Sequence, residues 1–378
     1  MRIAQVVPRG EQPWSGVLTV IVHLSAALSR QGHDVEVWQL HTWGPDYAEQ
    51  RHTLASAGVR ELPLAEGTPW WRVGRAVDRL AEEREVDIVH LHGAFNRWNT
   101  LTSRSLRRPY AFSPHSGFDP VSLRRSRSRK AVYGFLFERR MLRRAALLVA
   151  LTDAELSQLH DYGARSAAAV IPNGVASFAD GVDQEAFRTE LGIEQHTPLA
   201  LFVGRLDVYR KGLDRLVDAI AGAPDWHLAL VGPRFRDVEQ IDAMIEEYGI
   251  GNRVHFMEAR HGNRLSEALA AADVFTMLSR WEGLPMALLE ALAAGKPAVV
   301  SPEVGRLVPI ATSGAGWVAA EGDLPATLSR VAAAEAADVA RWGEAARLLA
   351  GRYDWDSVAQ QYAVAYGEAL ESESEAPQ

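Results

Sequence analysis

The chain alternates short apolar runs of β type with segments that repeat apolar residues at helical spacing. In the first half, strands are predicted at 3–7, 34–38, 87–91, 110–113 and 147–151, and helices at 17–29, 70–83 and 122–143. In the second half, strands are predicted at 199–203, 227–231, 254–257, 274–277 and 298–301, and the last helix at 356–370. This alternation is typical of doubly wound α/β architecture, in which helices cover a parallel sheet.

The alternation breaks once, at Ile171-Pro172-Asn173-Gly174-Val175 and the polar stretch that follows. We therefore predict two Rossmann-like domains facing a central cleft, residues 1–178 and 190–352. The helix 356–370 is expected to pack back on the first domain, and the polar tail 371–378 to be disordered. Ligands of open α/β sheets bind beyond the carboxyl ends of the strands, so chemistry is expected just after strands.

Composition narrows the class of protein. The 378 residues are 47% apolar, which gives ample core-forming surface, but no apolar run approaches the roughly 18 residues of a membrane span. The sequence contains no cysteine, so it has neither a disulfide framework nor a thiolate metal site. A net charge of -8 argues against general nucleic-acid binding. We expect a cytoplasmic enzyme or binding protein without a bound metal.

The densest candidate chemistry is Glu282-Gly283-Leu284-Pro285-Met286-Ala287-Leu288-Leu289-Glu290, which follows a predicted strand. Pro285 suits the first turn of a helix, and free N–H groups at a helix start bind anions. This helix is apolar on every side except at Glu290, so a buried carboxylate is predicted there, with sugar hydroxyls or an arginine as its partner. Glu282 lies about two turns earlier, so both carboxylates can face one ligand. The alternative is a surface Glu282 and a structural ion pair at Glu290.

The segment from Ser279 to Pro302, with its Gly295-Lys296-Pro297 turn, resembles the E-x7-E segment of the retaining GT-B glycosyltransferases of the GT4 type (glycosyl transferases group 1). Four other segments resemble parts of that family in the same order along the chain: 87–93, 110–117, 171–175 and 202–213, the last containing Gly204-Arg205 and Lys211-Gly212. The resemblance covers most of the chain and implies a GT-B fold.

In that family the C-terminal domain holds a nucleotide-diphosphate sugar and the N-terminal domain holds the acceptor. The resemblance implies that Arg205 and Lys211 bind the donor diphosphate, that Glu290 binds the nucleotide ribose, and that Glu282 binds hydroxyls of the transferred sugar. Further donor contacts are implied for Gly16, Gly204, Gly283, Leu284, Pro285 and Met286. Ser15 replaces one glycine of the usual pair before the first helix, which leaves the role of that position open.

His115 follows a predicted strand, and the resemblance implies that it approaches the transferred sugar. His90 and His92 alternate on another strand and so share one face, where packing is as reasonable a role as substrate contact.

The resemblance implies transfer with retention by front-face displacement, from a nucleotide-sugar donor to an acceptor hydroxyl. The sequence shows no metal-ligand cluster, so we expect an enzyme without a metal, and we expect no cofactor. A non-catalytic sugar-nucleotide-binding subunit and a GT-B-type epimerase are the alternatives. A nicotinamide-dependent oxidoreductase is disfavoured, because no G-x-G-x-x-G follows the first strand. The base, the sugar, the oligomeric state and the acceptor (polysaccharide, glycolipid or natural product) stay open.

Residues 122–144 carry nine basic side chains against the single acid Glu138. Such a cluster suits peripheral contact with anionic lipids at the inner face of a membrane, or attraction of a phosphorylated acceptor. The alternative is a solvated helix face in an arginine-rich protein.

Overall fold

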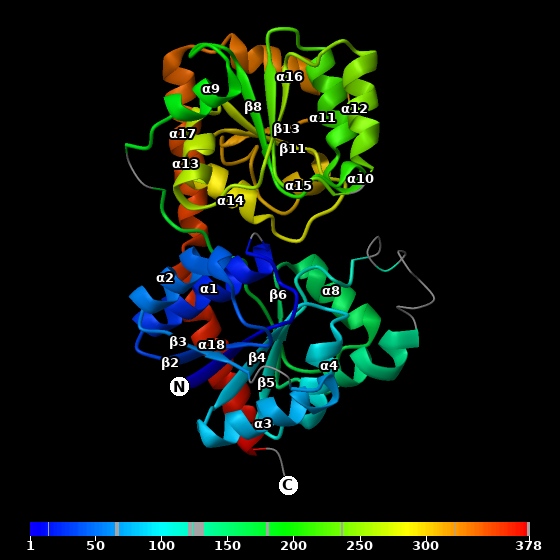
Figure 1. Ribbon diagram of the computed structural model, residues 1–378, viewed down its shortest axis with the longest axis vertical. Helices are drawn as coiled ribbons and strands as arrows, with labels where there is room; N and C mark the ends of the chain where they lie inside the picture. The colour runs from blue at the N-terminus through cyan, green and yellow to red at the C-terminus, as the bar shows by residue number, and fades with distance from the viewer. Residues whose placement is uncertain are drawn as a thin grey trace. The chain divides into compact units, whose positions relative to one another are not determined.

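The computed structural model describes residues 1–13, 15–64, 68–119, 123, 132–178, 181–235, 237–320 and 322–375. They form two compact units, one of Met1–Gly174 with Trp355–Gln378 and one of Val175–Asp354. Each unit has one sheet with helices packed against it, and every strand pair is parallel (Figure 1). The predicted α/β fold class is confirmed.

The sheet of the first unit has the order β3-β2-β1-β4-β5-β6-β7. Its strands are β1 (Arg2–Val7), β2 (Asp34–Gln39), β3 (Arg60–Pro63), β4 (Ile88–His92), β5 (Tyr110–Ser113), β6 (Leu147–Ala150) and β7 (Ala168–Val170). The five central strands agree with the sequence prediction within one or two residues. The edge strands β3 and β7 were missed: β3 is polar at its first two residues, and β7 is only three residues long.

The helices of this unit are α1 (Gly16–Arg30), α2 (Ala48–Ser56), α3 (Val73–Glu83), α4 (Arg97–Ser105), α7 (Arg139–Arg144), α8 (Asp153–Tyr162) and α18 (Trp355–Glu375). A π-helical turn, η3 (Gly134–Glu138), precedes α7, and two 3-10 turns, η1 (Pro45–Tyr47) and η2 (Trp70–Arg72), precede α2 and α3. Part of the helix predicted from residue 122, including Arg124 to Lys130, lies outside the described residues.

The last helix, α18, is longer than predicted. It runs to Glu375, so the expectation of disorder from residue 371 is wrong as far as the structure describes the tail. The hydroxyls of Ser372 and Ser374 bond to carbonyls within the helix, and glutamate is a good helix former. At its other end Trp355 stacks on His23 of α1, with ring centroids 5.8 Å apart.

The sheet of the second unit has the order β10-β9-β8-β11-β12-β13. Its strands are β8 (Leu199–Val203), β9 (His227–Val231), β10 (Val254–Met257), β11 (Val274–Met277), β12 (Ala298–Val300) and β13 (Gly316–Val318), of which only the edge strand β13 was not predicted. Its helices are α9 (Glu185–Leu191), α10 (Val208–Lys211), α11 (Leu213–Ala221), α12 (Val238–Glu247), α13 (Gly262–Ala271), α14 (Met286–Ala293), α15 (Pro302–Gly305), α16 (Leu324–Ala332) and α17 (Ala336–Ala350), with the 3-10 turn η4 (Gly351–Tyr353).

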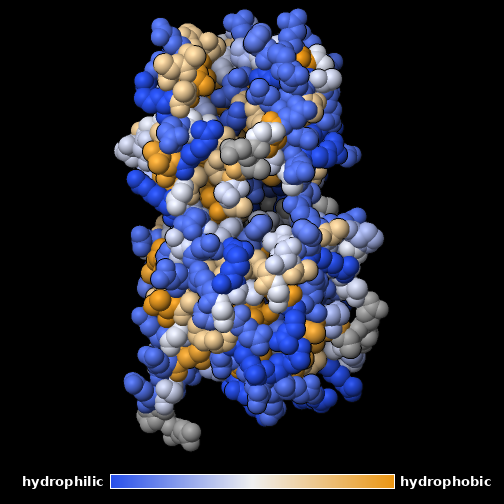
Figure 2. Space-filling model, turned by 90° about the vertical axis from the view of Figure 1, so that its left-hand side faces the viewer, coloured by the Kyte–Doolittle hydropathy of each residue, from blue (hydrophilic) through white to orange (hydrophobic). Residues whose placement is uncertain are grey.

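No helix among the described residues is both long and apolar enough to cross a bilayer. The face in Figure 2 mixes hydrophilic and hydrophobic residues in small patches rather than in a continuous apolar band.

Candidate functional site

The candidate residues of the second unit gather where its strand order reverses. Strands β8, β9 and β10 follow one another toward one edge of the sheet, whereas the next strand, β11, pairs with the other side of β8. Such a reversal opens a crevice at the carboxyl ends of the two strands, the usual ligand position in these sheets. Gly204 and Arg205 follow β8, and Ser279 to Glu282 follow β11. Two segments far apart in sequence therefore meet at one edge of the sheet.

A buried ion pair joins these two segments. The Lys211 ammonium donates to Glu282 Oε1 over 2.6 Å, and Arg210 lies 3.7 Å from Oε2. The Glu282 side chain is only 5% exposed, which rules out the alternative of a surface carboxylate. Burial disfavours the charged form of Glu282, but the charges of Lys211 and Arg210 and hydrogen bonding outweigh it and lower its pKa. Glu282 is therefore ionised at neutral pH, and two ammonium protons of Lys211 stay available for a ligand.

Arg280 holds the short helix α10, which carries Lys211. Its guanidinium binds both oxygens of Asp214, at 2.8 and 2.6 Å, and also donates to the Tyr209 carbonyl over 2.8 Å. Its backbone N–H donates to the Arg210 carbonyl over 2.9 Å. Sequence reasoning assigned no role to Arg210, Asp214 or Arg280. The position of Arg280 just after β11 was the available signal.

Gly212 lets the Lys211 segment lie directly against β11. It has φ +64°, and a Cβ added there would lie 2.1 Å from the Leu278 carbonyl oxygen. No side chain fits such an approach, so the position of Lys211 depends on this glycine.

Arg205, expected at the diphosphate, is exposed, and its guanidinium lies 4.9 Å from the centre of the Phe235 ring. Within the described part of the chain it forms no ion pair, in contrast to Lys211. The structure therefore brings Lys211 and Glu282 together and leaves Arg205 as an unneutralised charge beside Gly204.

The helix α14 begins after Pro285, which caps it rather than occupying its first turn. Leu288, Leu289, Ala291 and Leu292 are buried, whereas Met286, Ala287, Glu290 and Ala293 are partly exposed. The prediction of burial on all sides is thus wrong. The partly exposed positions share one helix face, and the short alanine side chains there leave it open. Glu290 lies on this face.

In the first unit, His115 follows β5 in an unusual turn. His115 and Ser116 have φ of +50° and +63°, values that non-glycine residues seldom adopt and that gather at functional sites. A buried carboxylate, Glu155, supports the turn by accepting from the backbone N–H of Ser116 over 2.5 Å and of Leu151 over 2.7 Å. Burial lowers the pKa of His115 to about 4, so its ring is neutral at pH 7.

His92 contacts His115 directly, with 3.0 Å between His92 Nδ1 and His115 Nε2. The sequence left open whether His90 and His92 pack or touch substrate, and it did not anticipate this pairing. Gly16, the remaining donor candidate of this unit, is the first residue of α1, and the Ser15 hydroxyl before it bonds to the Glu11 carboxylate.

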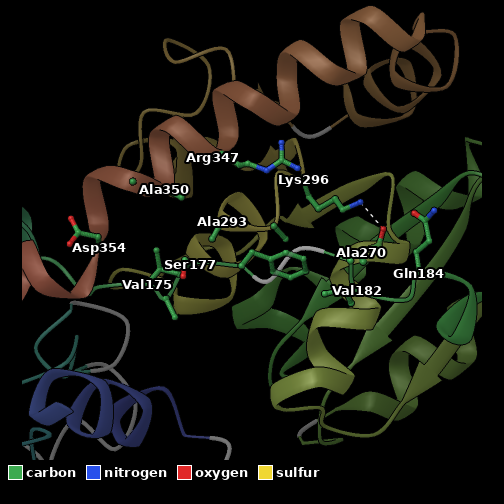
Figure 3. A pocket seen from close by; sticks show the side chains of 15 residues that line it. Val175, Ser177, Val182, Gln184, Ala270, Ala293, Lys296, Arg347, Ala350 and Asp354 are labelled. Atoms are coloured by element: carbon green, nitrogen blue, oxygen red, sulfur yellow. Dashed lines mark hydrogen bonds between the residues drawn. The ribbon is translucent and has the colours of Figure 1, made fainter. Parts of the chain in front are cut away.

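A separate pocket of about 540 Å³, whose lining does not include Glu282, lies at the C-terminal end of α14 (Figure 3). Lys296 borders it and donates to the Ala270 carbonyl over 2.7 Å, while burial lowers the pKa of this lysine to about 8. A lysine bound in this way joins α14 to α13, which is a structural role.

The described residues contain no cluster of three or more histidine, aspartate or glutamate side chains with metal-binding geometry. Metal-independent chemistry stays a prediction.

Both units match family models. Residues 14–177 match the model described as Glycosyltransferase Family 4, and residues 183–348 match Glycosyl transferases group 1. The chain is 26% identical to a GDP-mannose:cellobiosyl-diphosphopolyprenol alpha-mannosyltransferase of Xanthomonas campestris, over 98% of this chain and 97% of that protein. It is also 26% identical to a D-inositol 3-phosphate glycosyltransferase of Xylanimonas cellulosilytica, over 94% and 92%.

Solved structures show the same fold at lower identity. Sucrose-phosphate synthase of Thermosynechococcus elongatus aligns with TM-score 0.78 and 20% identity, over 98% of this chain and 99% of that one. HepE of Anabaena in complex with UDP-glucose aligns with TM-score 0.75 and 20% identity, over 98% and 100%. The chain belongs to the group 1 glycosyl transferases of the family 4 type, with a GT-B fold, and moves a sugar from a nucleotide sugar.

Proposed function

We propose that this glycosyltransferase transfers its sugar with retention of anomeric configuration, without a metal or cofactor. The observation that supports the proposal best is the buried Lys211–Glu282 pair at the switch point of the second sheet. In this pair an ionised carboxylate, Glu282, lies beside the Lys211 ammonium. In the proposal the carboxylate accepts hydrogen bonds from sugar hydroxyls, and the ammonium binds the diphosphate.

In this proposal Lys211 and Arg205 bind the diphosphate, Glu282 binds hydroxyls of the transferred sugar, and Glu290 binds the ribose. Backbone groups of Gly16, Gly204 and 283–286 complete the donor site. As the bond from the anomeric carbon to the phosphate oxygen breaks, the negative charge that grows on the diphosphate is stabilised by Lys211 and Arg205. The acceptor hydroxyl attacks the same face, and its proton passes to the departing phosphate oxygen. No enzyme carboxylate forms a covalent intermediate, so positioning and electrostatics supply the rate.

His115 contributes a neutral imidazole to binding of the transferred sugar. A neutral ring hydrogen-bonds to a hydroxyl without adding a second positive charge, and its low pKa keeps this state over the physiological range.

The test begins with the nucleotide. The protein is heated with UDP, GDP, ADP or TDP in turn. A nucleotide that binds the folded protein, at about a hundred times its dissociation constant, should raise the free energy of unfolding by about 2.7 kcal/mol. We expect one diphosphate to raise the melting temperature most, and Glu290→Gln to lose that rise with little change in the unliganded protein. An equal rise in melting temperature in both proteins would show that Glu290 does not bind the nucleotide. No rise with any of the four nucleotides would contradict the donor site.

The stereochemistry is tested on the product. With the matching nucleotide sugar, the anomeric coupling constant in the proton NMR spectrum of the product should show the configuration of the donor. An inverted linkage would contradict front-face displacement.

We further propose that η3 and α7 contact an anionic membrane surface. Val132, Phe135 and Leu136 are 61%, 71% and 54% exposed, and Arg140 and Arg143 follow them in the sequence. Exposed apolar side chains followed in the sequence by exposed arginines suit the interface of anionic lipids. The name of the Xanthomonas relative includes a diphosphopolyprenol. A long prenyl chain partitions into a membrane, so an acceptor of this kind would be consistent with the proposed membrane contact.

A further inference from the structure

A chain of hydrogen bonds runs through the first unit and ends at His115. It begins at Ser113 Oγ, 2.9 Å from His90 Nε2, and continues from His90 Nδ1 to the Tyr366 hydroxyl over 2.7 Å. The Gln5 amide nitrogen lies 3.4 Å from that hydroxyl, and the Gln5 amide oxygen lies 2.7 Å from His92 Nε2. The last link is the 3.0 Å contact from His92 Nδ1 to His115 Nε2.

The amide of Gln5 gives this chain a direction. An amide oxygen only accepts, so the proton in the Gln5–His92 bond belongs to His92 Nε2. A neutral imidazole carries one ring proton, which leaves a lone pair on His92 Nδ1. His115 Nε2 must then carry the proton in the contact between the two rings.

Burial keeps the rings of His90 and His92 neutral. His90 and His92 are fully buried, and burial lowers the pKa of both well below the ordinary histidine value. The two links from Gln5 to His92 and from His92 to His115 therefore decide which nitrogen of His92 and of His115 is protonated, rather than how many protons each ring carries.

The outer nitrogen of His115 is the free end of the chain. No hydrogen-bond partner of His115 Nδ1 occurs within the described parts of the structure, and the residue is partly exposed. With Nε2–H committed to His92, Nδ1 holds a lone pair that accepts and cannot donate.

We propose that Gln5 and His92 are positioning residues that fix the tautomer of His115, so that its Nδ1 accepts a hydrogen bond from a hydroxyl of the transferred sugar. This inference rests on the proposed function, which assigns His115 to that sugar. It adds a specificity rule: the position facing His115 must carry a donor, so a deoxy or O-methyl sugar at that position is a poor substrate.

Reversal of the chain gives the competing arrangement. If the Gln5 amide is turned over, His92 donates from Nδ1, His115 accepts at Nε2, and His115 Nδ1–H becomes a donor. The two arrangements contain the same heavy atoms and differ in the protonated nitrogen of His115, so a measurement of ring protonation separates them.

The measurement is a long-range proton–nitrogen NMR spectrum of full-length protein labelled with 15N-histidine, at pH 7. The His115 signals are assigned by their loss in His115→Gln. We expect Nε2 of His115 to be protonated and Nδ1 to be unprotonated. The reverse pattern would overturn the proposal, whether or not the protein transfers sugar.

Two variants of His92 test whether the tautomer of His115 affects sugar transfer. The amide of asparagine branches from the same carbon as histidine Nδ1, so His92→Asn keeps an acceptor for His115. Glutamine carries its amide one carbon further, so His92→Gln keeps the contact with Gln5 and loses that with His115. We expect His92→Gln to populate both tautomers of His115 and to lower kcat/KM about tenfold, and His92→Asn to restore both.

His90→Gln is the matched control, since His90 is equally buried on the same strand face and does not touch His115. It should leave the tautomer of His115 as in the wild type. Equal loss of activity in all three variants with an unchanged His115 spectrum would assign His92 a structural role only. A donor-induced rise in melting temperature without any effect of these variants on turnover would contradict the inference and leave the proposed function intact.

Discussion

Lys211 and Glu282 link the stability of the second unit to the proposed donor chemistry. A carboxylate with 5% of its side chain exposed is stable in its charged form only while a cation lies beside it. The ligand-binding charge of Lys211 is therefore also a structural charge, and its removal affects folding as well as binding.

We expect Lys211→Met to lower the free energy of unfolding by about 3 kcal/mol, because it leaves Glu282 buried without its closest counter-charge. The double variant Lys211→Met/Glu282→Gln should recover much of this loss, since the uncompensated charge is gone. Urea unfolding of the wild type, both single variants and the double variant measures the coupling. Additive losses would show that the two side chains do not stabilise each other.

The turn between α10 and α11 is the element on which the position of Lys211 depends. Gly212 and Gly249 share φ +64°, but only at Gly212 would a Cβ meet another atom, the Leu278 carbonyl oxygen at 2.1 Å. The chain thus contains its own control for the cost of backbone conformation alone.

Gly249→Ala should cost about 1 kcal/mol in unfolding free energy, the ordinary penalty of a left-handed alanine. Gly212→Ala should cost distinctly more and should weaken nucleotide-diphosphate binding, because α10 must move away from β11. Urea unfolding and thermal shift with the matching diphosphate measure the two effects. Equal costs with unchanged binding would show that the turn does not position Lys211.

The segment formed by η3 and α7 is tested with vesicles. Phe135→Ser/Leu136→Ser and Arg140→Gln/Arg143→Gln should each reduce co-sedimentation with vesicles containing anionic lipid at low salt, since they remove the apolar and the charged part of the contact. Leu348→Ser is the control, as Leu348 is 66% exposed on α17 of the other unit. Absence of wild-type binding would leave an ordinary solvated face, and binding unaffected by the variants would place the contact elsewhere.

Across the whole molecule, buried neutral histidines set the response to acid. The pKa values of His23 and His115 are lowered by burial to about 4, and those of His90 and His92 fall well below 6.5. In this range the unfolded chain binds protons that the folded chain does not, so stability falls as the pH falls. Glu138, whose pKa burial raises to about 7, acts in the opposite sense.

We therefore expect the urea midpoint to fall between pH 7 and pH 4. His23→Phe keeps an aromatic ring against Trp355. In this variant the free energy of unfolding should fall less steeply below pH 6.5, by up to about 1.4 kcal/mol per pH unit. His52→Phe replaces an exposed ring on α2 and should retain the wild-type dependence. Identical profiles in all three proteins would mean that His23 is charged in the folded state.

The apolar periodicity of the sequence determined the fold class and the central strands of both sheets, because strands buried on both faces require continuous apolar runs. It also located Gly204-Arg205 and Glu282 at strand ends, since a motif and the strand before it are neighbours in the chain. The short edge strands β3, β7 and β13 were not predicted, whereas the edge strand β10 was.

Only the tertiary structure decided which chemical groups meet. Lys211 and Glu282 are 71 residues apart, and His90 and Tyr366 are 276 apart, so their contacts depend on strand order and register rather than on local pattern. The same holds for Arg280 with Asp214 and for His92 with His115. A sequence carries the types of these residues, but a hydrogen bond needs two atoms within about 3 Å, a precision that only the packed sheets and their connecting loops supply.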